Sequence, residues 1–106
     1  KEMEIGRYYQ RAHQPLAAMN RYRTVVENAE FQRTSHAPEA LYRLVEVSLE
    51  LGLKDEAIRN GAVLGHNFPG SPWYSEAYSL LTRQGDRPEV EPEARREGWL
   101  SRIIPG

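Results

Sequence analysis

The sequence contains no cysteine, and it has almost no excess of charge of either sign. Without cysteine the chain can form no disulfide, no thiolate metal site and no cysteine nucleophile. Its 14 lysines and arginines stand against 15 aspartates and glutamates, which gives a formal net charge of −1. Nucleic-acid binders and polybasic membrane anchors usually carry an excess of positive charge, so this balance disfavours both classes of protein.

Long hydrophobic runs and a targeting segment are also missing. No apolar run approaches the roughly 18 residues that a membrane-spanning helix needs, and the first residues do not show the pattern of a signal peptide. The chain starts with Lys1-Glu2-Met3 and not with an initiator methionine. We therefore expect it to be a processed or truncated piece, in which the absence of a targeting segment carries little weight.

Hydrophobic residues recur at helical spacing in several stretches that are separated by short breakers. No stretch shows the alternation of a β-strand. Proline stands at the start of three of the stretches and Gly52 follows one of them, and these are the positions that proline and glycine favour at helix ends. The expected helices span residues 2–12, 15–27, 38–51, 54–66 and 72–83, with a shorter one at 93–104. Residues 28–35 and 84–91 are polar and are expected to form a loop and a linker.

An internal repeat relates the first helical pair to the second. The equivalent positions stand 39 residues apart, and they are Gly6 and Val45, Ala18 and Ala57, and Tyr22 and Gly61. The tetratricopeptide (TPR) repeat has 34 residues, and its small and aromatic positions let two helices pack closely. The five additional residues fit the loop at 28–35. We therefore expect an all-α fold, a TPR antiparallel helix-hairpin solenoid of about two and a half repeats.

The repeat divides the chain into four segments. They are a TPR repeat with an extended loop at 1–35, a TPR repeat at 36–70, a terminal capping helix at 71–84, and a linker with a short amphipathic segment at 85–106. Gly61 and Gly65 are predicted to leave a groove that Tyr78 or Trp73 fills from the next helix. Because arrays need about three repeats to bury a continuous core, Met3, Ile5 and Tyr8 are expected to face an upstream repeat.

No constellation of residues indicates catalysis or a bound metal. The histidines His13, His36 and His66 are scattered along the chain, and no metal-binding or phosphate-binding motif occurs. Glu46 and Glu50 share a helix face, where a solvated surface is a better interpretation than a general acid–base pair. We therefore predict no enzymatic activity, no cofactor, no metal site and no small-molecule substrate.

A binding surface has better support. TPR arrays stack their helices into an extended groove that binds other chains. The residues expected to line it are Arg7, Gln10, Glu39, Tyr42 and Glu46. Their mixed charges disfavour the lysine-lined clamps that hold the terminal carboxylate of a peptide. Four arginines, at positions 7, 11, 21 and 23, are concentrated in the first repeat. Their guanidinium groups suit carboxylates on a partner, although an ordinary solvated face explains them about equally well.

Several longer runs of sequence are more specific than the general TPR pattern. They are Lys1-Glu2-Met3-Glu4-Ile5-Gly6-Arg7-Tyr8-Tyr9, Ala18-Met19-Asn20-Arg21-Tyr22, Glu39-Ala40-Leu41, Leu51-Gly52-Leu53, Ala62-Val63-Leu64-Gly65-His66-Asn67-Phe68-Pro69 and Ser71-Pro72-Trp73-Tyr74. With these runs, about residues 1–82 resemble the BamD family, the TPR lipoproteins of the outer-membrane β-barrel assembly machinery. The likeness is greatest to α-proteobacterial members.

The resemblance implies that this chain is the C-terminal half of a lipoprotein with five TPRs, held at the periplasmic face of the bacterial outer membrane. It also implies that the C-terminal repeats dock on a POTRA domain of BamA. The pair Asn20-Arg21 matches the arginine that contacts BamA in the family. Arg21 is thus the expected partner of a POTRA carboxylate, with Asn20, Arg23 and Asn28 as weaker neighbours.

We therefore predict a non-catalytic scaffold of the β-barrel assembly (Bam) complex, which supports the folding and insertion of outer-membrane proteins. Other Bam subunits are expected partners, and nucleic acid is not an expected partner. The protein is expected to contact the membrane only through a lipid anchor that lies outside this chain. Two alternatives stay open: another periplasmic TPR adaptor, for cell division or a peptidoglycan-linked complex, and a regulatory TPR module of an enzyme complex. Residues 99–104 are expected to cap the array, with contact to a partner or lipid as the alternative.

Overall fold

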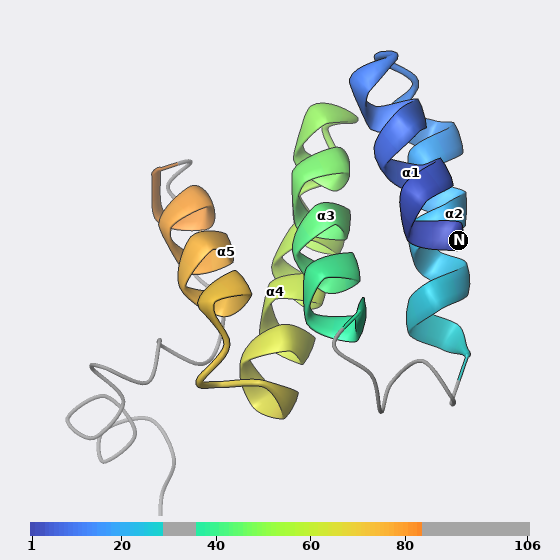
Figure 1. Cartoon of the computed structure of the whole chain (residues 1–106). Helices are drawn as coiled ribbons and strands as arrows, with labels where there is room; N and C mark the ends of the chain where they lie inside the picture. Colours follow the sequence, from blue (N-terminus) through green and yellow to red (C-terminus); the bar gives the residue numbers. More distant parts are fainter. Residues whose placement is uncertain (29–35, 84–106) are drawn as a thin grey trace, which may run out of the picture.

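The computed structural model describes residues 1–28 and 36–83, and these ranges contain five α-helices and no strand. The helices are α1 (Glu2–Arg11), α2 (Pro15–Glu27), α3 (His36–Glu50), α4 (Lys54–Asn67) and α5 (Pro72–Arg83). Figure 1 shows the α1–α2 and α3–α4 pairs side by side, with α5 beyond the second pair. This arrangement confirms the predicted all-α, TPR-like helix-hairpin solenoid. The segment boundaries stay predictions, and the expected linker and the helix at 93–104 lie outside the described residues.

The helices of this described part are too short or too polar to cross a membrane. Four of the five expected helices match within one residue at each end. The third begins at His36, two residues earlier than predicted. Pro38 therefore lies in the first turn, where the backbone N–H has no partner within the helix and its absence costs little.

Helix α3 lies in the middle of the array and contributes to two hydrophobic clusters. Ala40, Leu44 and Val47 pack with α1 and α2 in one cluster, and Leu41 and Val45 pack with α4 and α5 in the other. The spacing of three and four residues within each set places the two sets on different faces of the helix. Burial on both sides makes α3 the element that joins the two helix pairs into one body.

The first cluster corrects one expectation. Met3 is only 3% exposed and packs with residues of α2 and α3. Its side chain is therefore buried within this chain, without an upstream repeat. Tyr8, five residues further along α1, is 59% exposed. The reason is the helical period, since a step of five residues turns a side chain well away from the face on which Met3 lies.

Two glycines accept tyrosine rings from a neighbouring helix. A Cβ atom built on Gly6 would lie 2.5 Å from Cε1 of Tyr22, which confirms the predicted close approach of α1 and α2. A Cβ atom on Gly65 would lie 2.6 Å from Cζ of Tyr74. The prediction that Tyr78 or Trp73 fills the space at Gly65 is therefore wrong. The rotation of α5 about its axis directs Tyr74, and not Tyr78 or Trp73, toward Gly65 of α4.

The ends of α1 and α3 have the same left-handed geometry. Gly52 has a φ of 78°, as its position after α3 predicts, and His13 has a φ of 61° after α1. At α1 the N–H of His13 donates to the carbonyl oxygen of Gln10, and the N–H of Gln14 donates to that of Tyr9. This pair of bonds is the Schellman arrangement, which normally has glycine in the left-handed position. The histidine is therefore a point of backbone strain.

Replacing His13 by glycine should stabilise the chain by about 1 kcal/mol, because glycine adopts the left-handed conformation without a steric penalty. Urea unfolding followed by circular dichroism measures the change. Gly52→Ala is the reciprocal control: a Cβ atom there meets no atom within 4 Å, so the expected loss of about 1 kcal/mol comes from the backbone alone. A His13→Gly variant that is less stable than the parent would contradict the assignment of strain.

Candidate interaction surface

The structure brings the five predicted groove residues together where α1 faces α3. Arg7 donates from Nε and Nη2 to the two carboxylate oxygens of Glu39, at 2.9 Å and 2.5 Å. Arg43 donates from Nε to the same carboxylate at 3.2 Å. Glu39 is only 8% exposed, and hydrogen bonds from Arg7 hold the pKa of its carboxyl below the ordinary value. A buried charge needs such pairing, so Glu39 is the centre of this group.

A second carboxylate, that of Glu46, extends the network along α3. It accepts hydrogen bonds from Gln10 Nε2 at 2.9 Å, from Arg43 Nη1 at 2.9 Å and from the hydroxyl of Tyr42 at 3.0 Å. The network therefore crosses from α1 to α3 at two levels, once through Glu39 and once through Glu46. We define the α1–α3 network as the side chains of Arg7, Gln10, Glu39, Tyr42, Arg43 and Glu46.

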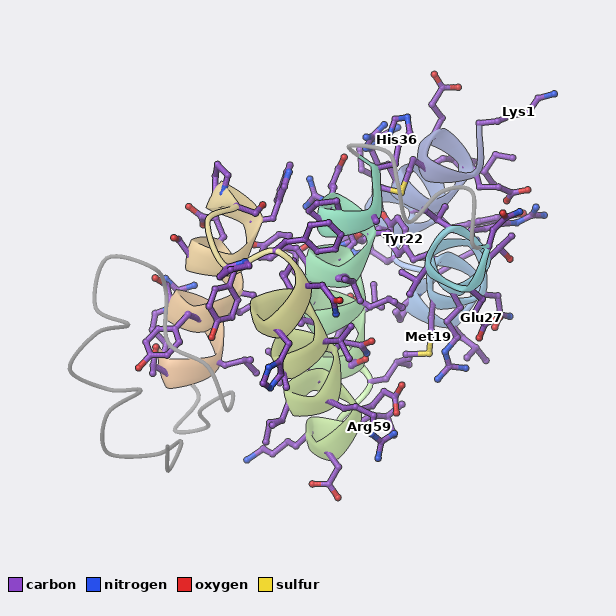
Figure 2. All side chains as sticks on the ribbon, turned by 90° about the horizontal axis from the view of Figure 1, so that it is seen from below. Lys1, Met19, Tyr22, Glu27, His36 and Arg59 are labelled. Carbon is purple, nitrogen blue, oxygen red and sulfur yellow. The ribbon has the colours of Figure 1, made fainter. Side chains whose placement is uncertain are left out.

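A buried tyrosine connects this network to the hydrophobic core. Tyr22 is fully buried on α2 and its hydroxyl donates to Oε1 of Gln10 at 2.7 Å. Figure 2 shows its ring inside the helix array. Burial raises the pKa of Tyr22 to about 12 and also raises that of Tyr42 to about 12. Both phenols thus stay protonated at neutral pH and act as hydrogen-bond donors.

Arg43 is a central member of the network that the sequence reasoning missed. Besides its two carboxylate partners, its guanidinium carbon lies 5.5 Å from the ring centre of Tyr42 and 5.4 Å from that of Trp73. Stacking of this kind orients a guanidinium group and leaves its edge available. The signal was present in the sequence, because Arg43 follows Glu39 by four residues and precedes Glu46 by three, the distances at which helix side chains meet.

A hollow of about 260 Å³ opens over the network and is lined by Arg7, Gln10, Arg11 and Arg43. We call it the arginine hollow. Arg11 is exposed at the end of α1, and no ion pair involves it among residues 1–28 and 36–83. Arg7 and Arg43 are paired with the carboxylates of Glu39 and Glu46, so Arg11 is the arginine of this hollow without a carboxylate partner among the described residues. Such a site can recognise an anion, and within the described ranges no cluster suited to a metal ion occurs.

The predicted partner-binding residues on α2 do not gather at one place. Asn20 and Arg21 line the same hollow, of about 320 Å³, and Nη1 of Arg21 lies 3.2 Å from a carboxylate oxygen of Glu2. Arg23 instead pairs with Glu56 of α4 at 3.5 Å, and Asn28 is the residue that ends α2. Only Asn20 and Arg21 thus form a common surface.

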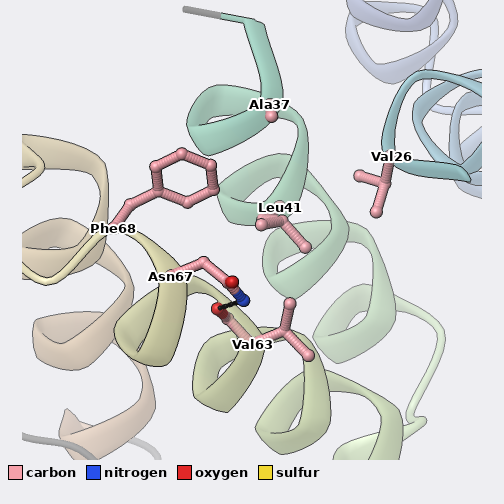
Figure 3. Close-up of a pocket in the computed structure, with 6 residues that line it drawn as sticks. All are labelled: Val26, Ala37, Leu41, Val63, Asn67 and Phe68. Carbon is pink, nitrogen blue, oxygen red and sulfur yellow. Dashed lines mark hydrogen bonds between the residues drawn. The ribbon is translucent and has the colours of Figure 1, made fainter. Parts of the chain in front are cut away.

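A further hollow, of about 290 Å³, lies between α2, α3 and the end of α4. Figure 3 shows Val26, Leu41 and Val63 pointing toward it, with Ala37 and Phe68 at its upper side. The amide of Asn67 donates to the carbonyl oxygen of Val63 at 2.8 Å. The lining is mainly apolar, so this hollow suits an apolar side chain and not a charged ligand.

Comparisons with known proteins agree with one another. The family model described as YfiO, outer membrane lipoprotein, matches residues 1–64. A relative from Caulobacter vibrioides, named outer membrane protein assembly factor BamD, is 59% identical over 98% of this chain and 34% of its own length. A relative of the same name from Rickettsia prowazekii is 53% identical over 76% of this chain and 32% of its own length. The chain spans about a third of these relatives. No solved structure matches it.

Proposed function

Because this chain belongs to the YfiO family of outer membrane lipoproteins, we propose that it is part of a non-catalytic factor for the assembly of outer membrane proteins. The observation that carries the proposal is the 59% identity to a BamD assembly factor over nearly the whole chain. The same identity confirms the resemblance to the BamD family, and membership assigns the chain to the outer membrane. The rigid helix array, with its mutually paired charged groups, suits recognition of another protein better than catalysis.

We further propose that α2 supplies the contact with a POTRA domain of BamA, through Arg21 and Asn20. The side chain of Arg21 is 42% exposed and that of its partner Glu2 is 30% exposed. Exposed ion pairs contribute only about 0–1 kcal/mol, so a carboxylate on a partner can replace Glu2 at little cost. Arg23 and Asn28 stay weaker candidates, because Arg23 already connects α2 to α4.

Reversing the charge of Arg21 should weaken the binding of BamA. We expect Arg21→Glu to cost about 2 kcal/mol, or roughly thirtyfold in the dissociation constant, since a carboxylate would then face the POTRA carboxylate. Isothermal titration calorimetry of the full chain with the purified POTRA domains of its cognate BamA measures this change.

The matched control is Arg83→Glu. Arg83 is also an exposed arginine, but it is the last residue of α5, a helix that does not pack against α2. It should bind BamA as the parent chain does. Recovery of the Arg21→Glu loss by a carboxylate-to-lysine change on BamA would identify the partner residue. Unchanged affinity of Arg21→Glu, with its circular dichroism intact, would remove Arg21 from the interface, and failure to bind BamA at all would refute the proposed function.

A further inference from the structure

We propose that the arginine hollow is a second binding site, which takes the carboxylate side chain of an acidic segment in a partner polypeptide. The hollow lies where α1 faces α3, whereas the surface proposed for BamA lies on α2. The inference therefore does not depend on Arg21, and the two surfaces can be tested separately.

The hydrogen-bond donors of the hollow are held in place before any ligand binds. A guanidinium group has five N–H donors. Arg7 uses Nε and Nη2, and Arg43 uses Nε and Nη1, for the carboxylates behind them. Nη1 of Arg7 and Nη2 of Arg43 thus have no partner in the part of the chain that the structure describes. Because the two guanidinium groups are already fixed, a ligand loses little of their conformational entropy on binding.

The charges at the hollow favour a ligand with a single negative charge. Arg7 and Arg43 pair with Glu39 and Glu46, and Arg11, which also lines the hollow, is in no ion pair within the described residues. One carboxylate carries one negative charge and can pair with Arg11. A phosphate group carries nearly two negative charges at neutral pH, and Glu39 and Glu46 would repel the excess. The charge balance thus favours a carboxylate over a phosphate.

Two aromatic side chains next to the hollow indicate the source of the carboxylate. Tyr42 and Trp73 have ring centres 5.3 Å apart, with their planes tilted by 38°, and both rings contact the guanidinium group of Arg43. Both side chains are only partly buried, so part of each ring is exposed beside Arg43. Such rings are typical anchors for the neighbouring residues of a bound polypeptide. A free small acid would not use them, so a polypeptide segment is the occupant that this surface fits.

The test titrates the full chain, labelled with nitrogen-15, with short peptides blocked at both ends. One peptide carries a single central glutamate beside a tyrosine, and the other carries glutamine in its place. Only the glutamate peptide should shift the Nε–Hε signals of Arg7, Arg11 and Arg43. Sodium acetate and inorganic phosphate should bind more weakly than this peptide. Equal shifts with the glutamine peptide, or equally tight binding of acetate or phosphate, would overturn the proposal.

Two variants make the test specific. Arg11→Gln should weaken binding of the glutamate peptide roughly fivefold, and it should fold normally because the side chain it removes is exposed. Arg59→Gln removes an exposed arginine from α4, whose side chain is 69% exposed, and should leave the affinity unchanged. An equal loss in both variants would show a general effect of net charge and would refute the site. Arg11→Gln should bind BamA normally, which separates this proposal from the proposed function.

Discussion

Replacing Gly6 by alanine should lower the free energy of unfolding by about 2 kcal/mol, although alanine is the better helix former. A Cβ atom at this position would lie 2.5 Å from Cε1 and 2.9 Å from Cδ1 of Tyr22. Tyr22 is fully buried and cannot move its ring away. Overpacking of this kind costs about 1–3 kcal/mol or more, whereas the gain in helix propensity is only about 0.5–1 kcal/mol. Urea unfolding monitored by circular dichroism measures the difference.

A double-mutant cycle identifies the cause of this loss. In a Tyr22→Leu background the ring is gone, and Gly6→Ala should become neutral or slightly stabilising, by up to about 1 kcal/mol. Tyr22→Leu alone should also destabilise the chain, since it removes packing and the hydrogen bond to Gln10. If Gly6→Ala lowers the free energy of unfolding equally in both backgrounds, contact with Tyr22 is not the cause of the loss.

The close approach of α1 and α2 was predicted because the TPR pattern places small residues between the helices of a pair, and the structure adds that the ring of Tyr22 fills the space at Gly6. At Gly65 the sequence indicated that a large side chain of the next helix fills the space, but it did not identify this side chain as Tyr74. Which residue of α5 fills that space depends on the rotation of one helix about its axis, and a step from Tyr74 to Trp73 turns the side chain by about 100°. Periodicity identifies the buried faces of a helix, but it does not specify which residues meet across two helices.

The same distinction applies to the interaction surface. The sequence predicted that residues of α1 and α3 would share one face, and the structure places Arg7, Gln10, Glu39, Tyr42 and Glu46 together. The sequence did not predict which of these groups pair, because the pairing depends on how far α1 is displaced along α3. The left-handed conformation of His13 was not predicted either, because glycine, and less often asparagine, is the residue that usually marks such a position. The partner-binding role of Arg21 stays a prediction.

Glu39 should make the largest polar contribution to stability. We expect Glu39→Gln to lower the free energy of unfolding by about 2 kcal/mol at pH 7, because it leaves Arg7 and Arg43 side by side without their shared carboxylate. The loss is smaller than for a fully buried pair, since the side chains of these arginines are 33% and 27% exposed. Glu50→Gln is the matched control, at an exposed position on the same helix, and it should change stability by less than about 0.5 kcal/mol.

The dependence on pH distinguishes the charge of Glu39 from its packing. The hydrogen bonds from Arg7 lower the pKa of the Glu39 carboxyl in the folded chain relative to the ordinary value of 4.5. A lowered pKa means that the unfolded chain takes up this proton first as the pH falls. The stabilisation is therefore fully present above about pH 4.5 and is lost as the pH falls through the lower pKa of the folded state. Urea unfolding at a series of pH values should show the stability of the parent chain approaching that of Glu39→Gln in acid. A gap to Glu39→Gln that persists undiminished at the lowest pH would mean that side-chain shape, and not the ion pairs with Arg7 and Arg43, accounts for the effect.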